Sequence, residues 1–80
     1  MKGKFQVFVR TLTGASIIVT VTSSDLVRSL KEKIQHQVGI PFCLQRLIFE
    51  GSQLEEAQAI GQRGLTKDST VHLVLSLRGG

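Results

Sequence analysis

The chain has 80 residues and is 41% hydrophobic, and its ten Lys and Arg residues against six Asp and Glu residues give a formal charge of +4 at pH 7. This length predicts one domain, and the hydrophobic content excludes a chain that is disordered throughout. No apolar run approaches the roughly 18 residues of a membrane span, and residues 1–4 lack the apolar stretch of a signal peptide.

The single cysteine, Cys43, excludes an internal disulfide and is typical of a reducing compartment, so we expect a cytoplasmic and nuclear protein. The positive charges are spread along the chain, and the four Phe residues do not alternate with them as a nucleic-acid stacking platform requires. We therefore expect a monomer that uses no cofactor and contacts neither a membrane nor nucleic acid.

Two segments near the N-terminus alternate apolar and polar residues. Residues 5–11 and 17–21 have the period-two pattern of half-buried strands, and Gly14 between them suits a tight turn. We predict an antiparallel hairpin. Its inward side chains would be Phe5, Val7, Val9, Ile17, Val19 and Val21.

The next segment has apolar residues at helical spacing. Ser23–Asp25 offers side-chain oxygens that cap a helix start, Gly39 suits a helix end, and Pro41 prevents its continuation. We predict a helix from about Leu26 to Val38. Its buried stripe would be Val27, Leu30, Ile34 and Val38, and its solvent face Arg28, Lys31, Glu32, Lys33, Gln35 and Gln37.

The second half contains strand patterns on either side of an irregular stretch. Residues 45–50 and 70–77 predict strands, with a brief strand near residues 52–53. The inward residues of the last strand would be Val71, Leu73, Leu75 and Leu77. We predict an α+β fold in which one main helix covers a mixed sheet of four to five strands.

Several motifs, spread in order over the chain, resemble the ubiquitin family. They are Thr11–Gly14, Gly39–Pro41, Gln45–Phe49, Ser69–Leu75 and Leu77–Gly80. The resemblance covers Phe5 to Gly80 and implies a β-grasp fold, with a domain over residues 5–76 and a flexible conjugation tail over residues 77–80. Residues 1–4 would be an extension, or residues left when the domain was cut from a tandem protein.

The resemblance also implies a function. In this family the C-terminal glycine, here Gly80 after Gly79, is joined by E1, E2 and E3 enzymes to lysine amines of target proteins, and proteases reverse the bond. Ser76, Leu77 and Arg78 match the positions that E1 and the proteases recognise. The chain would itself not be an enzyme, because neither Cys43 nor a histidine lies in a pattern of nucleophile, base or metal ligands.

Three surfaces are implied by the resemblance. The main partner-binding patch, read by ubiquitin-binding domains, would be Leu12, Ile48, His72 and Val74. A secondary patch near the tail would be Ile40, Leu75 and Leu77. A third, smaller surface would be Gln6, Phe8 and Ser16. For the main patch the alternative is a set of scattered exposed side chains without a role, and for the secondary patch it is core packing or simple docking of the tail.

Three lysines, Lys31, Lys33 and Lys67, match positions that form chains in the family, with Lys67 in an exposed loop as the first candidate acceptor. A solvated charge without a role is the alternative. Ser52 stands where the family has another chain-forming lysine, which excludes an isopeptide bond at that position.

Four departures from the family pattern carry expectations of their own. Leu26 replaces a helix-capping threonine, so Ser24 or Asp25 would have to cap the helix, or the helix start would fray. If exposed together, Phe42–Leu44 would form an apolar patch for a partner or a neighbouring domain. Arg63 replaces a bracing tyrosine, so we expect a looser loop there. Ser76 replaces an arginine and leaves open which E1 accepts the chain. A non-covalent ubiquitin-like interaction domain from a larger protein remains the alternative to a modifier.

Overall fold

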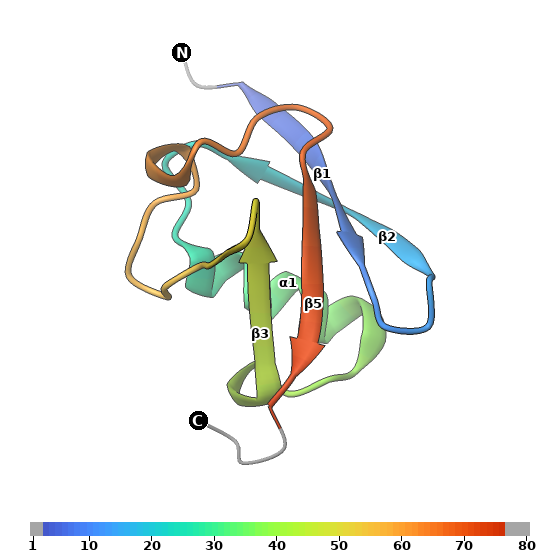
Figure 1. Ribbon diagram of the computed structural model, residues 1–80. Helices are drawn as coiled ribbons and strands as arrows, with labels where there is room; N and C mark the ends of the chain where they lie inside the picture. Colours follow the sequence, from blue (N-terminus) through green and yellow to red (C-terminus); the bar gives the residue numbers. More distant parts are fainter. Residues whose placement is uncertain (1–2, 77–80) are drawn as a thin grey trace.

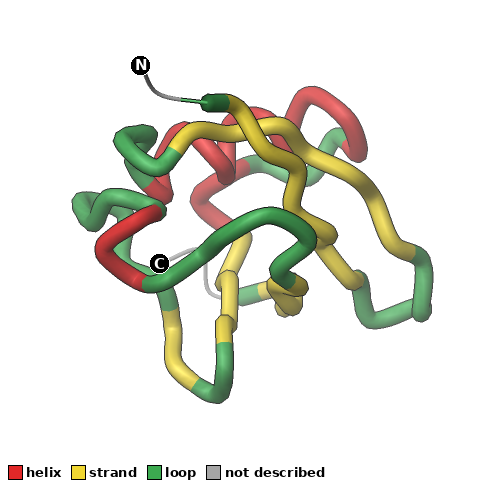
Figure 2. The backbone as a smooth tube through the Cα atoms, turned by 90° about the horizontal axis from the view of Figure 1, so that it is seen from above, coloured by secondary structure: helices red, strands yellow, loops and turns green. Residues whose placement is uncertain are grey.

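The sheet and helix of the computed structural model, which describes residues 3–76, form the predicted mixed architecture. In chain order the elements are β1 (Lys4–Arg10), β2 (Ser16–Thr22), α1 (Val27–Val38), the 3₁₀ turn η1 (Phe42–Leu44), β3 (Gln45–Phe49), β4 (Ser52–Gln53), the 3₁₀ turn η2 (Gly61–Arg63) and β5 (Thr70–Leu75). The strand order is β2-β1-β5-β3-β4, and α1 lies across one face of the sheet (Figure 1 and Figure 2).

The pairing of β1 and β5 makes the sheet mixed. These two strands, the first and last of the chain, are parallel, whereas β1–β2, β3–β5 and β3–β4 are antiparallel. The α+β prediction and its β-grasp arrangement are therefore confirmed. β1 begins at Lys4, which pairs with Thr22, so the strand includes the last residue of the predicted extension.

The core lies between the sheet and α1. Three of the four stripe residues of the helix, Val27, Leu30 and Ile34, are fully buried. They pack in one cluster with the inward side chains of the strands and with Leu54, Ile60 and Leu65, which lie in the irregular stretch between β4 and β5. The other core residues are Val7, Val9, Val19, Val21, Leu47, Phe49, Val71 and Leu73.

Two predicted inward residues are exposed instead. Val38 is the last residue of α1 and is 36% exposed, because the chain turns away at Gly39, whose φ of 80° ends the helix. Leu75 is the last residue of β5 and is 42% exposed, while the next residue, Ser76, is buried. The alternation of β5 therefore breaks at its end.

Lys31 was predicted on the solvent face of α1, and that prediction is wrong. The residue is only 5% exposed, and its Nζ lies 3.5 Å from Oε2 of Glu56. The aliphatic stem lies against the domain while the ammonium pairs with the loop carboxylate, which explains how a lysine is accommodated there.

The start of α1 is capped by a loop rather than by the side chains predicted for it. The N–H of Val27 donates to the carbonyl of Gln58 (2.9 Å), and the N–H of Arg28 donates to that of Glu56 (3.1 Å). Leu26, at the N-cap, makes no side-chain hydrogen bond. Neither Ser24 nor Asp25 caps the helix.

Arg63 braces the irregular stretch, contrary to the expected loosening. Its Nη1 donates to the carbonyl of Gln53 (2.8 Å) and to Oε1 of Gln58 (3.0 Å). One planar guanidinium with several donors thus ties two parts of this stretch together.

Within residues 3–76, no helix has both the length and the apolar character needed to cross a membrane.

Candidate functional site

The main patch lies on the outer face of the sheet, by which we mean the face opposite α1. Ile48 pairs with His72 across β3 and β5, and both residues alternate with buried neighbours, so their side chains point outward. Val74 lies two residues further along β5 on the same face. Ile48 and Val74 are half-buried and His72 is exposed.

Cationic side chains lie beside this patch. Arg10 of β1 is level with His72 in the parallel pairing, and Arg46 of β3 is opposite Val74 in the antiparallel one. Both arginines are exposed. The arrangement combines a small apolar centre with positive charge, which favours a partner that has apolar anchors and carboxylates.

Leu12 occupies the turn between β1 and β2, where it is 75% exposed. The turn is held by the N–H of Thr11 donating to the carbonyl of Ala15 (2.9 Å) and that of Gly14 donating to Thr11 (3.0 Å). The tip of the hairpin therefore presents an apolar side chain on an ordered turn.

The secondary patch forms a shallow apolar hollow with this turn. The hollow has a volume of about 230 Å³ and is lined by Thr11, Leu12, Thr13, Ile40, Leu73 and Leu75. The structure thus brings Leu12, assigned to the main patch, together with Ile40 and Leu75. Leu77, the third predicted member, lies outside the described residues.

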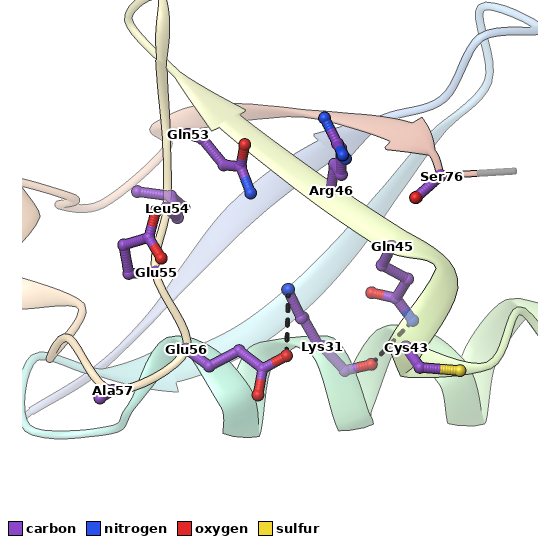
Figure 3. Close-up of a pocket in the computed structure, with 10 residues that line it drawn as sticks. All are labelled: Lys31, Cys43, Gln45, Arg46, Gln53, Leu54, Glu55, Glu56, Ala57 and Ser76. Carbon is purple, nitrogen blue, oxygen red and sulfur yellow. Dashed lines mark hydrogen bonds and ion pairs between the residues drawn. The ribbon is translucent and has the colours of Figure 1, made fainter. Parts of the chain in front are cut away.

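Ser76 is fixed to the domain just after β5. Its N–H donates to the carbonyl of Leu44 at 2.7 Å, and the residue is 8% exposed. With Lys31, Gln45 and Glu56 it lines a cleft of about 370 Å³ between β3 and the segment after β4 (Figure 3). Of the predicted tail-recognition and conjugation residues, Leu77, Arg78, Gly79 and Gly80 lie outside the described residues.

Gln45 is the most buried polar residue of residues 3–76, and its structural role was not predicted from the sequence. Its Nε2 donates to the carbonyls of Lys31 (3.0 Å) and Ile40 (2.9 Å), which holds the secondary-patch residue Ile40 against α1 and β3. A signal existed, because Gln45 shares the inward alternation of Leu47 and Phe49.

The three candidate acceptor lysines differ in their surroundings. Lys31 is buried and paired, as described above. Lys33 Nζ donates to the carbonyl of Thr20 at 2.8 Å and lies 3.6 Å from Oδ2 of Asp25. Lys67 is exposed in the loop before β5. Of the three, Lys67 therefore presents its amine most openly.

Asp25 has a perturbed carboxyl group at the turn before α1. The N–H of Thr22 donates to its Oδ2 at 2.9 Å, and this bond is the main reason that the pKa of Asp25 lies below its ordinary value. Partial burial acts in the opposite direction, and the nearby Lys33 ammonium lowers the pKa further.

The residues of the Phe42–Leu44 segment are not exposed together, so the apolar patch considered for it does not form. Phe42 and Leu44 are half-buried in η1, and only Cys43 is exposed. The Phe42 ring lies 5.6 Å from the guanidinium carbon of Arg28, and the Phe42 N–H donates to Oε1 of Gln35 at 2.9 Å. The segment thus packs against α1.

On the third surface, Ile18 extends the apolar area around Phe8, although the sequence did not predict Ile18 as part of this surface. Ile18 of β2 is opposite Phe8 in the hairpin and is 51% exposed. Gln6 and Ser16 are exposed on the same strands. The signal was the position of Ile18 between the inward residues Ile17 and Val19.

Among residues 3–76 no group of three or more His, Cys, Asp or Glu side chains could hold a metal ion.

Comparison with known proteins identifies the family. Residues 7–78 match the Ubiquitin family. The chain is 45% identical to the NEDD8-like protein RUB1 of Saccharomyces cerevisiae over 72 residues, which cover 90% of this chain and 94% of the relative. It is 36% identical to the NEDD8-like protein RUB3 of Arabidopsis thaliana over 75 residues, which cover 94% and 96% of the two chains.

A different relative contains the same domain within a longer protein. The chain is 37% identical to the AN1-type zinc finger protein 4 of Mus musculus over 75 residues, which cover 94% of this chain but 10% of the relative. The similarity to NEDD8-like proteins along nearly their whole length supports a ubiquitin-like modifier in general terms. The fold, the order of motifs and these matches together show that the chain belongs to the ubiquitin family.

Proposed function

We propose that this protein is a covalent modifier whose Gly80 carboxylate becomes joined to lysine amines of other proteins. An E1 would convert the carboxylate into an acyl-adenylate with ATP and then into a thioester on its own cysteine. An E2 would receive the acyl group, and an E3 would direct it to the target. The lysine nitrogen then forms an amide bond as the acyl–sulfur bond breaks.

The attachment of Ser76 is the observation that carries this proposal. The 2.7 Å hydrogen bond to Leu44 fixes the chain directly before the Leu77–Gly80 sequence. The apolar hollow of Leu12, Ile40 and Leu75 lies at the same end of β5. An enzyme that binds this hollow is therefore brought close to the residue from which the tail begins.

The buried side chain of Ser76 limits how it would take part in recognition. At 8% exposure it offers little surface to an E1, so its contribution would come from where it directs the following residues. Leu77 and Arg78 would then supply the direct contacts of the tail with E1 and with deconjugating proteases. We place the protein in the cytoplasm and nucleus, where conjugation enzymes and targets would meet it.

The outer face of the sheet would serve as the surface to which partner proteins bind. Ile48 and Val74 would provide the apolar contact for ubiquitin-binding domains, with His72 at the rim and Arg10 and Arg46 available for acidic side chains.

The experiment is a charging assay with purified E1 enzymes of the ubiquitin and NEDD8 types. We expect the chain to form, in the presence of ATP, an E1 adduct that a thiol reductant removes. A matched variant that lacks Gly79 and Gly80 keeps all the described residues and should form no adduct. Comparison of Ser76→Arg with the unchanged chain would show which E1 the residue favours.

A second candidate is a non-covalent interaction domain. The match to a small part of a much longer zinc finger protein favours it, because the same domain there is one piece of a larger chain. Failure of every E1 to charge the protein, together with loss of partner binding in Ile48→Ala, would support this candidate and contradict the modifier.

A further inference from the structure

Strand β2 lies at one edge of the sheet and is therefore open to pairing with another strand. Two carbonyls on this edge are occupied by side chains of α1. Gln37 Nε2 donates to the carbonyl of Ile18 at 3.0 Å, and Lys33 Nζ donates to that of Thr20 at 2.8 Å. These carbonyls are two residues apart, as the acceptors along one strand edge are.

Lys33 also connects the edge to the turn before the helix. Its ammonium lies 3.6 Å from Oδ2 of Asp25, and the same oxygen accepts the N–H of Thr22, the last residue of β2. A single ammonium group thus holds α1, β2 and the turn together. The side chain of Lys33 is 43% exposed, so reagents and enzymes can reach its amine.

We propose that Lys33 and Gln37 act as a latch on the β2 edge, and that acylation of Lys33 releases this edge to pair with the β2 edge of a second copy of the chain. In the acylation step the Lys33 nitrogen forms an amide bond to the acyl carbon of a thioester. The acyl–sulfur bond breaks, one ammonium proton goes to the departing thiolate and another to solvent.

Acylation acts on the latch through charge and size. The amide nitrogen is neutral and retains one N–H, so it loses the ion pair with Asp25 and cannot hold both partners. The added acyl group also needs space beside Thr20. Gln37 remains on the Ile18 carbonyl, which predicts partial opening by acylation alone and fuller opening when Gln37 is also removed.

A second copy is the partner that fits the edge best. Two identical strand edges are self-complementary when they pair antiparallel about a twofold axis. Ile18, 51% exposed on this edge, lies beside the half-buried Phe8, so pairing would bring apolar side chains of both copies onto one extended sheet face. Neutralising Lys33 also removes a cation that each copy would otherwise bring to the contact.

The inference rests on the proposed function only for the natural source of the acyl group, a thioester of the chain itself. Its test avoids that source. Protein with acetyl-lysine incorporated at position 33 is compared by sedimentation velocity with unmodified protein and with acetyl-lysine at position 67, which carries the same change of charge. A second sample combines acetyl-Lys33 with Gln37→Ala.

We expect acetyl-Lys33 protein to shift from one chain toward two as its concentration rises, and the Gln37→Ala combination to shift at lower concentration. Ile18→Asp in either sample should restore the single chain, because the two copies would bring like charges together. Circular dichroism establishes that each sample is folded. At concentrations where both proteins are single chains, hydrogen exchange should be faster at Thr22 in acetyl-Lys33 protein than in acetyl-Lys67 protein, because Asp25 has lost its ion pair.

Three results would overturn the proposal. One is a folded acetyl-Lys33, Gln37→Ala protein that stays a single chain throughout the concentration series. Another is equal self-association of the acetyl-Lys67 protein, and the third is a dimer that Ile18→Asp leaves intact. Each can occur whether or not an E1 charges Gly80, so the latch and the proposed function fail separately.

Discussion

At the scale of single residues, Asp25 shows how a local hydrogen bond becomes a dependence of stability on pH. Its carboxylate accepts the N–H of Thr22 and faces Lys33, so its pKa in the folded state lies below the ordinary value of 3.8. A carboxyl group with a lowered folded pKa stabilises the fold above the unfolded pKa, and this contribution disappears as pH falls through the folded pKa.

We predict that Asp25→Asn makes the protein less sensitive to acid. Near neutral pH the variant should unfold at lower urea concentration than the unchanged chain, because the charged acceptor is gone. The difference should shrink as pH falls from 3.8 downward, since Asp25 itself then becomes protonated. Urea unfolding curves at several pH values measure this, and a constant difference at every pH would contradict the assignment.

Substitutions at Lys31 can separate the contribution of its buried aliphatic stem to stability from that of its charge. We predict that Lys31→Ala lowers the free energy of unfolding by about 2 kcal/mol, because it removes buried methylene groups. Lys31→Met keeps most of the stem and leaves Glu56, 45% exposed at its side chain, free to be solvated. Its loss should therefore be no more than about half of the alanine value. Equal losses in the two variants, measured by chemical denaturation, would assign the stabilisation to the ion pair instead.

At the scale of elements, the irregular stretch between β4 and β5 supports the start of α1. It supplies the carbonyls of Glu56 and Gln58 to the first turn of the helix, and the N–H of Gly61 donates to the carbonyl of Ser23 at 2.8 Å. The apolar stripe predicted the helix, but it could not reveal that a distant segment caps it. That information lies in tertiary contacts, which have no local pattern in the sequence.

Gly61 tests the docking of this stretch. A Cβ at position 61 would lie 2.9 Å from Cβ of Ser23 and 3.1 Å from its carbonyl oxygen, so the two segments would have to separate. We predict that Gly61→Ala lowers the free energy of unfolding by about 1–3 kcal/mol. Gly3→Ala is the matched control, because a Cβ there meets nothing within 4 Å. Equal stability of the two variants would show that the stretch is not held against the turn.

The proposed partner-binding patch on the outer face of the sheet can be tested by substitution, also at the scale of elements. We predict that Ile48→Ala weakens binding to ubiquitin-receptor helices about tenfold, a loss that corresponds to about 1.4 kcal/mol, while the fold stays intact. Isothermal titration with a receptor domain measures the affinity. Ile18→Ala on β2, which β1 and β5 separate from β3, is the control, and an equal effect of both substitutions would place the contact elsewhere on the sheet.

At the scale of the whole molecule, alternation and helical spacing were enough to predict the order of the main elements. They were weakest at the ends of elements, where Val38 and Leu75 lie outside the core and Gln45 is buried, and at Lys31, which is buried in the middle of α1. These buried polar side chains have partners elsewhere in the chain. Gln45 Nε2 donates to the carbonyls of Lys31 and Ile40, whereas Gln45 Oε1 has no hydrogen-bond partner among the described residues, and the Lys31 ammonium pairs with Glu56. The patch residues were predicted from the resemblance, and strand pairing placed Ile48 beside His72.

The central claim concerns the carboxylate of Gly80, and mass spectrometry of conjugates tests it most directly. Tagged protein would be recovered from cells under denaturing conditions, with a variant lacking Gly79 and Gly80 as its control. We predict target peptides with lysines joined through an isopeptide bond to the Gly80 carboxyl group, present for the full chain and absent for the variant. A tagged chain recovered only in its free form would contradict the account.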